Sequence, residues 1–181
     1  MVYMFLADGF EEIEALAVVD ILRRGGVGIN TVSITKEQVV TGAHGIPVVA
    51  DITYKKLADE AECVILPGGL PGTTNLGKSR VVEQTVKEAL EKGGVIAAIC
   101  AAPSVFYDYG LLDGKKATSY PDYEDYMKNC VYTGKAVEVD GNIVTSRGAG
   151  TAHLFGFKLL EMLRGKETAE KIKNAMQYGC E

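Results

Sequence analysis

The side chain with the most reactive chemistry in this sequence is Cys100, which ends an apolar run. The run at 95–99 predicts a buried parallel strand, and small residues follow it at once. A helix-length segment then continues to about Tyr109, so Cys100 falls on a sharp strand-to-helix turn of the kind that holds nucleophiles. The helix N-terminus would favour the thiolate, so we expect a pKa below the roughly 8.5 of a free cysteine. A buried structural cysteine is the alternative.

Glu14 is the second candidate, because it is a carboxylate on an apolar helix stripe. The stripe consists of three residues: Ala17, Val18 and Ile21. At about 100° per residue, Glu12 lies on the opposite side of the helix, which we expect to face solvent. Burial would raise the pKa of Glu14, so that a protonated Glu14 could donate a hydrogen bond to a thiolate. The alternative is a carboxylate that reaches water or pairs with an arginine: Arg23, Arg24 or Arg147.

A glycine-rich turn, Pro67-Gly68-Gly69-Leu70-Pro71-Gly72, follows another apolar run. Glycines directly after a strand let backbone N–H groups approach a ligand closely. The N–H groups of Gly69 and Ala101 are therefore candidates for an oxyanion hole, with Gly68 as an auxiliary residue. The run matches neither a dinucleotide fingerprint nor a P-loop, and a plain tight turn is the alternative.

The two histidines have no neighbours at metal-ligand spacing, so the sequence predicts no metal site. His44 falls in a turn and is expected to be exposed. His153 begins a helix and is expected to pack or to cap it. The glycine-rich loop at 148–150 could bind an anion at the N-terminus of that helix, or could serve as a simple cap.

Composition limits the classes of protein that this chain can belong to. Its 181 residues predict one domain, 1–181, and its net charge of −5 argues against nucleic acid as a partner. No apolar run approaches the length of a membrane span, and the amino terminus lacks the basic flank of a signal peptide. The four cysteines form no C-x-x-C pair, which predicts free thiols in a reducing cytoplasm.

Strand and helix patterns alternate along the chain. We expect strands at 2–7, 27–34, 63–66 and 95–99, a β excursion at 39–49, and a hairpin at 136–146 that turns at Asp140-Gly141 or Gly141-Asn142. We expect helices at 10–24, 54–60, 81–92, 151–163 and 166–178. This order predicts an α/β fold with a mostly parallel sheet covered on both faces. Ligands bind beyond the carboxyl ends of such strands, where three segments meet: 7–14, 67–72 and 100–103.

Five segments, taken together and in this order, resemble the ThiJ/PfpI superfamily and, within it, the branch of the parkinsonism-associated deglycase. The segments are LADGFEEIE at 6–14, VILPGG at 64–69, AAICAAP at 97–103, KKATSYP at 115–121 and VTSRGAGT at 144–151. The resemblance covers essentially the whole chain. It implies a flavodoxin-like, three-layer α/β/α sandwich, usually a homodimer, with no cofactor.

The resemblance also assigns roles to the candidate residues. Cys100 matches the family's oxidisable nucleophile, Glu14 its protonated glutamate, and Gly69 and Ala101 the backbone donors beside the sulfur. Tyr120 stands where the human-type pattern has histidine. A tyrosine hydroxyl, with a pKa of about 10, is a poor base near neutrality but a usable hydrogen-bond donor. This difference argues against a Cys–His dyad and against protease activity.

Two classes of function follow from the resemblance. The first is a cofactor-free enzyme of the glyoxalase or deglycase type, which acts on small 2-oxoaldehydes or glycated substrates through Cys100 and Glu14. The second is an oxidative-stress sensor or redox-regulated chaperone that acts through oxidation of Cys100 to sulfinate. A vestigial site is a third possibility. Cys100 is expected to be the most reactive thiol, Cys63 to be inert in its strand, and Cys130 and Cys180 to lack an activator.

Overall fold

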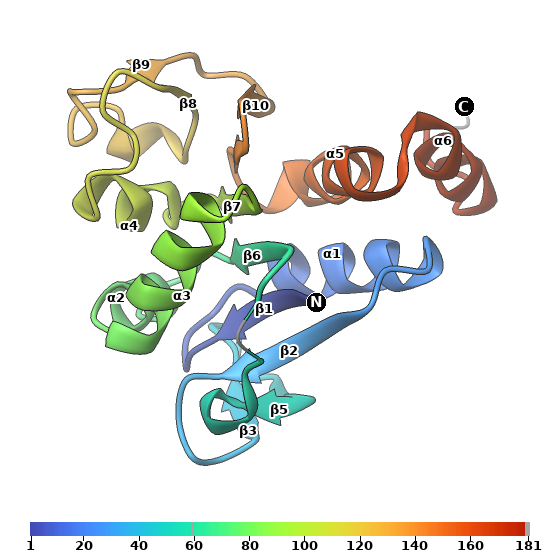
Figure 1. Cartoon of the computed structure of the whole chain (residues 1–181), viewed down its shortest axis with the longest axis horizontal. Helices are drawn as coiled ribbons and strands as arrows, with labels where there is room; N and C mark the ends of the chain where they lie inside the picture. Colours follow the sequence, from blue (N-terminus) through green and yellow to red (C-terminus); the bar gives the residue numbers. More distant parts are fainter. Residues whose placement is uncertain (59, 180–181) are drawn as a thin grey trace.

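The computed structural model describes residues 1–58 and 60–179, and is built around one seven-stranded sheet (Figure 1). The strand order is β10-β11-β7-β6-β1-β2-β5, and only the β10–β11 pair is antiparallel. The strands are β1 (Val2–Leu6), β2 (Ile29–Ser33), β5 (Ile52–Thr53), β6 (Cys63–Leu66), β7 (Val95–Ile99), β10 (Val137–Asp140) and β11 (Ile143–Ser146). The predicted, mostly parallel sheet is confirmed.

Helices cover both faces of the sheet, and its central strands are therefore buried on both sides. In β1, Val2 and Met4 contribute to one apolar core while Tyr3 and Phe5 contribute to the other. The first core is closed by α1 (Glu12–Arg24), α5 (Ala152–Arg164) and α6 (Lys166–Ala175), which lie together in Figure 1. The second is closed by α2 (Gly72–Gly77), α3 (Arg80–Glu91) and α4 (Pro103–Asp108). The chain therefore forms the predicted flavodoxin-like α/β/α sandwich.

Short elements decorate the ends of the main strands. They are the antiparallel pair β3 (Val39–Thr41) and β4 (Pro47–Val49), the parallel pair β8 (Lys116–Ala117) and β9 (Val131–Tyr132), and the 3-10 turns η1 (Tyr54–Lys56), η2 (Pro121–Tyr123) and η3 (Ala149–Thr151). The β excursion expected at 39–49 is thus a hairpin. The helix expected at 54–60 is wrong for the residues that the structure describes, which make only the single turn η1 directly after the edge strand β5; residue 59 lies outside them.

The structure of the β10–β11 hairpin decides between the two turn positions that the sequence left open. Asp140 pairs with Ile143, so the turn residues are Gly141 and Asn142. Gly141 has φ of 60°, a conformation that glycine adopts without steric cost. This hairpin places β11 beside β7, and therefore beside the strand that leads to Cys100.

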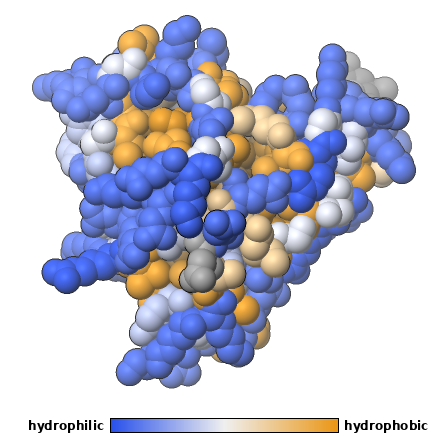
Figure 2. Space-filling view, viewed as in Figure 1, coloured by the Kyte–Doolittle hydropathy of each residue, from blue (hydrophilic) through white to orange (hydrophobic). Residues whose placement is uncertain are grey.

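No helix within 1–58 and 60–179 is long and apolar enough to cross a bilayer. On the face seen in Figure 2, apolar side chains form separate patches among hydrophilic ones.

Candidate active site

Three loops converge at the carboxyl ends of β1, β6 and β7, as the order of elements predicts. The Glu11 N–H donates to the Gly68 carbonyl at 2.9 Å, and the Gly72 N–H donates to the Gly9 carbonyl at 3.2 Å. A Cβ added to Gly69 would lie 2.5 Å from the Glu11 nitrogen, so a side chain has no room there. Close packing of backbone against backbone therefore joins the loop after β1 to the glycine-rich turn after β6.

Cys100 lies at the turn between β7 and α4 in a strained conformation. Its φ is 64°, in the left-handed region that costs a non-glycine residue about 1–3 kcal/mol. The Cys100 N–H donates to the Ser146 carbonyl at 2.9 Å, and the Ala102 N–H donates to Ile99 at 3.0 Å. These bonds hold the turn between two buried strands and present the half-buried sulfur at the edge of the sheet.

Glu14 lies in the first turn of α1 and points into the protein, with 1% of its surface exposed. Its Oε2 accepts a hydrogen bond from the Gly68 N–H at 2.8 Å, and its carboxyl is hydrogen-bonded to the Cys100 thiol. Glu11 caps the helix by accepting the Glu14 N–H at 2.7 Å. The alternatives of a solvated or arginine-paired Glu14 are wrong. The three arginines bond elsewhere: Arg23 to Asp51, Arg24 to Asp20, and Arg147 to the Gly134 carbonyl.

The surroundings of Glu14 raise its pKa to about 7. The sequence predicts this increase, though not its size. Burial disfavours the carboxylate, and the nearby Glu11 adds a small effect of the same sign. The hydrogen bonds from the Gly68 N–H and the Cys100 thiol oppose burial without cancelling it. A carboxyl group with this pKa exists in both protonation states near neutral pH, which suits a group that accepts and returns protons.

The prediction that Cys100 has a lowered pKa is wrong. Burial is the largest effect, and the charge and hydrogen bond of the Glu14 carboxylate add to it, raising the pKa to about 12. The Ala101 and Gly69 N–H groups bond to the sulfur and lower the pKa, but they do not outweigh the other effects. The helix contributes little, because α4 is short and begins with Pro103, which has no N–H to offer. In the resting site Cys100 is therefore a thiol that keeps its proton and donates a hydrogen bond to Glu14.

The glycine-rich turn leaves space for the Cys100–Glu14 pair. A Cβ on Gly68 would lie 2.6 Å from the Cβ of Cys100 and 2.6 Å from Oε2 of Glu14. Gly69 has φ of 87°, which directs its N–H toward the sulfur at no steric cost. The backbone at these two positions thus contacts both reactive side chains.

Tyr120 borders the sulfur from the other side. Its N–H donates to the Cys100 carbonyl at 2.8 Å, while the residue as a whole is 46% exposed. A Cβ on Gly148 would lie 3.7 Å from Cδ2 of Tyr120 and 4.0 Å from Sγ of Cys100. The tyrosine ring and Gly148 therefore flank the approach to the thiol.

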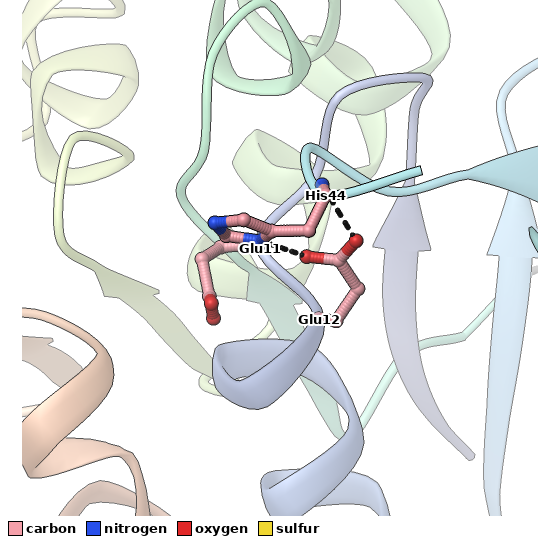
Figure 3. A group of neighbouring side chains, drawn as sticks. All are labelled: Glu11, Glu12 and His44. Atoms are coloured by element: carbon pink, nitrogen blue, oxygen red, sulfur yellow. Dashed lines mark hydrogen bonds and ion pairs between the residues drawn. The ribbon is translucent and has the colours of Figure 1, made fainter. Parts of the chain in front are cut away.

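A carboxylate–imidazole pair beside the site was missed at the sequence level. Glu12 is buried rather than solvent-facing, and accepts the His44 N–H at 2.8 Å and bonds the His44 Nδ1 at 2.7 Å (Figure 3). Burial would raise the pKa of Glu12, but these bonds outweigh it and lower the pKa. Ligand atoms of Glu11, Glu12 and His44 lie within 4.8 Å of one another, a spacing that a metal ion could bridge. Both Glu12 oxygens are already bonded to His44, so the pair fastens the β3–β4 turn to α1.

The other candidate residues lie apart from this site. Cys63 is fully buried, and burial raises its pKa far above the ordinary value. The half-buried Cys130 donates to the Met127 carbonyl at 3.1 Å. Cys180 lies outside the described residues. His153 stacks on Tyr178, with 5.7 Å between the ring centroids.

The sequence profile of the DJ-1/PfpI family matches residues 1–162. The chain belongs to the DJ-1/PfpI family. Within that family it is similar to Protein dj-1beta of Drosophila melanogaster, with 36% identity over 96% of this chain and 94% of that protein. The crystal structure of Drosophila DJ-1beta superposes with a TM-score of 0.93 at 36% identity, covering 97% of this chain and 96% of the other.

Two further relatives bear on length and activity. Protein DJ-1 homolog B of Arabidopsis thaliana is 40% identical over 94% of this chain but only 40% of that protein, so the chain spans less than half of that relative. A Caenorhabditis elegans protein named glutathione-independent glyoxalase DJR-1.2 is 32% identical over 90% of this chain and 87% of that protein. The DJ-1/PfpI family thus includes a protein named for glyoxalase activity.

Proposed function

We propose that this protein converts 2-oxoaldehydes such as methylglyoxal to 2-hydroxy acids, without glutathione or any other cofactor. One observation carries the proposal: the Cys100 thiol lies beside the buried Glu14 carboxyl group, so close that a Cβ on Gly68 would be 2.6 Å from both side chains, and two backbone N–H groups interact with its sulfur. These are the three groups that a thiol addition to an aldehyde requires, namely a nucleophile, a base and donors for the oxyanion. The name of the Caenorhabditis elegans relative supports the same chemistry.

The reaction begins with the Cys100 thiol. The sulfur bonds to the aldehyde carbon while Glu14 takes the thiol proton. The Gly69 and Ala101 N–H groups stabilise the alkoxide that forms, because they already point at the sulfur to which its carbon becomes attached. Glu14 then returns the proton to the alkoxide oxygen, which leaves a hemithioacetal and an ionised carboxylate.

The second half of the reaction is an internal proton transfer. Glu14 removes the hydrogen of the former aldehyde carbon as a proton, giving an enediol, and delivers it to the neighbouring carbon. The hydroxyl proton moves from the first oxygen to the second, so the product is a thioester of lactate. Water cleaves the thioester and releases lactate with the thiol restored. Methylglyoxal plus water has then become lactate, with no net oxidation or reduction.

Tyr120 assists this scheme only as an auxiliary residue. Its ring lies against Gly148 at the approach to the sulfur, and its main chain bonds to Cys100. A phenol is a poor base at neutral pH, so the proton transfers are assigned to Glu14. The absence of histidine at position 120 argues against a Cys–His protease mechanism.

A redox function of the same cysteine is the second candidate. Two equivalents of hydrogen peroxide would convert the thiol to a sulfinic acid and release two waters. The favouring observation is the pair of N–H groups from Gly69 and Ala101, which could bind sulfinate oxygens as they bind the sulfur. In this case oxidation of Cys100, not turnover, would be the event that a partner protein detects.

We also propose that the protein is a homodimer that functions in a reducing compartment such as the cytoplasm. Apolar side chains are exposed on α1 and on the adjoining β3–β4 hairpin: Ile13, Leu16, Val39, Ile46 and Val49. The Glu12–His44 bonds join α1 to the turn of the β3–β4 hairpin, so these exposed residues lie on two neighbouring elements. An apolar region of this kind on a small protein is typical of an interface. The three described cysteines are free thiols, which fits a reducing compartment.

The test of the enzymatic proposal is lactate formation from methylglyoxal in the absence of glutathione. Wild type is expected to turn over the substrate, and Cys100→Ser is expected to lose nearly all activity because a hydroxyl is a far weaker nucleophile at this site. Cys63→Ser is the matched control, since Cys63 lies in β6 away from the site. Equal turnover by wild type and Cys100→Ser would exclude the mechanism. Negligible turnover by wild type would favour the redox function.

A further inference from the structure

A pocket of about 650 Å³ lies beside the candidate active site, between the segment at 134–136, Tyr120 and the loop that leads into α5. Most of its lining residues are small or apolar. Among the described residues that line it, Arg147 is the only one with a charge. A single cation in an otherwise neutral pocket is a feature that binds an anionic group.

Arg147 has hydrogen-bonding capacity to spare. Its Nη1 donates to the Gly134 carbonyl at 3.0 Å, which uses one of the five N–H donors of a guanidinium. Within 1–58 and 60–179 it forms no ion pair, whereas Arg23, Arg24 and Arg164 each bond to a carboxylate. A guanidinium held in place by a carbonyl, with its charge unpaired, can bind a carboxylate through two parallel hydrogen bonds.

The pocket is adjacent to the sulfur. Gly148 follows Arg147 and lines the pocket, and a Cβ at Gly148 would lie 4.0 Å from Sγ of Cys100. Because Gly148 carries no side chain, nothing at that position separates the pocket from the thiol. A molecule attached to Cys100 would therefore lie beside Gly148, in the wall of the pocket that Arg147 also lines.

We propose that Arg147 is a specificity-determining residue that binds a carboxylate of the substrate. The preferred substrates are then 2-oxoaldehydes that carry a carboxylate at the end remote from the aldehyde, rather than neutral methylglyoxal itself. This assignment rests on the proposed function for its substrate class, but the anion site is a property of the pocket and can be measured separately. The same pocket borders the loop at 148–150, where the start of the thirteen-residue helix α5 adds a partial positive charge.

A structural role for Arg147 is the competing interpretation, because its bond to Gly134 also anchors the chain before β10. Gly150 offers a variant that leaves this bond intact. It lines the pocket, its φ lies outside the left-handed region, and a Cβ there would meet nothing within 4 Å. Gly150→Asp adds a carboxylate that opposes an anion, and Gly150→Asn is the matched neutral control. Arg164→Gln is the control for loss of one positive charge, at the far end of α5.

The first measurement is the ratio of kcat/KM for 4,5-dioxopentanoate to kcat/KM for methylglyoxal. Arg147→Gln and Gly150→Asp are expected to lower this ratio by about tenfold or more, mainly through KM, since a charge-assisted bidentate contact is lost or opposed. Arg147→Lys is expected to lie between Gln and wild type. Gly150→Asn and Arg164→Gln should keep the wild-type ratio. A ratio that is the same in Gly150→Asp and Gly150→Asn would overturn the proposal.

The second measurement does not depend on turnover. Iodoacetate and iodoacetamide both alkylate Cys100 with loss of iodide, but only iodoacetate carries a carboxylate. The quantity measured is the alkylation rate of Cys100 by iodoacetate divided by the rate by iodoacetamide. This ratio is expected to be at least threefold lower in Gly150→Asp than in Gly150→Asn, because the new carboxylate opposes an anion. It is also expected to be at least threefold lower in Arg147→Gln than in Arg164→Gln, because the anion site is removed. Unchanged relative rates would refute the anion site. If methylglyoxal is not turned over but these rates change as expected, the proposed reaction fails and the anion site stands.

Discussion

At the scale of single residues, the proposed function depends on Glu14 and Cys100 acting as one unit that holds a mobile proton. Burial raises the pKa of both groups. The charge of Glu14 raises the pKa of Cys100 further, while the hydrogen bond with the Cys100 thiol lowers the pKa of Glu14. Sequence reasoning could predict the buried Glu14 from its helix stripe. It could not predict the raised pKa of Cys100, because the effects of burial and of a neighbouring carboxylate depend on how closely the loops pack. The thiol therefore does not rest as a thiolate, and the proposed reaction needs a base to activate it.

The raised pKa of Glu14 predicts a pH-dependent cost to stability. The folded-state pKa of about 7 lies above the ordinary value of 4.5, so stability from this group is full below 4.5 and is lost as pH rises through 7. Glu14→Gln removes this dependence. From pH 5 to pH 8, the free energy of unfolding of wild type is expected to fall relative to the variant by roughly 2 to 3 kcal/mol. Urea unfolding at the two pH values measures this, and a constant difference would contradict the burial effect.

Tyr120 provides a second test at this scale. If Tyr120 contributes one hydrogen bond and no proton transfer, Tyr120→Phe should lower kcat/KM for methylglyoxal by only a few-fold, about the worth of one neutral hydrogen bond. Steady-state kinetics of the variant decide the matter. A loss of several orders of magnitude would show that the tyrosine hydroxyl is essential and that the scheme above lacks a group.

At the scale of elements, the sequence predicts the main strands, and the sheet edge where their loops meet, better than the short elements and long-range contacts around them. Apolar runs identify β1, β6 and β7, and parallel topology then places three loops at one edge. Short elements such as α2 and β5 could not be predicted, since α2 has no apolar periodicity and β5 has only two residues. The Glu12–His44 pair was missed for a related reason, because its partners are 32 positions apart and meet only when the β3–β4 hairpin folds onto α1.

The turn after β6 yields a prediction at the same scale. Gly68→Ala would place a Cβ 2.6 Å from both the Cys100 Cβ and a Glu14 oxygen, so the loops must move apart. Overpacking of this kind costs about 1–3 kcal/mol, and displacement of the pair by about 1 Å is expected to lower kcat/KM about 100-fold. Gly28→Ala is the control, because a Cβ there meets only Met1, at 3.7 Å or more. Thermal unfolding and lactate formation measure the two effects. An active, stable Gly68→Ala would show that the close approach is unnecessary.

At the scale of the whole molecule, the exposed apolar residues on α1 and the β3–β4 hairpin predict self-association. The chain has a mass of 19.4 kDa, and sedimentation at micromolar concentration is expected to give about twice that value. Leu16→Asp places a charge within the apolar region and is expected to shift the protein toward monomer, since an unpaired charge is costly to bury. Leu70→Asp is the control, because Leu70 is exposed on a different loop. A wild-type protein that sediments as a monomer would contradict the homodimer.

The pH dependence of lactate formation tests the central claim most directly. With methylglyoxal as substrate and no glutathione, kcat/KM of wild type is expected to rise with pH through about 7, because Glu14 must be ionised to accept the thiol proton. Glu14→Gln keeps the shape of the site but cannot cycle a proton, so kcat/KM should fall by about 10²–10⁴ and lose the rise near pH 7. Wild type that forms no lactate, or a Gln variant with the wild-type rate and profile, would contradict the account.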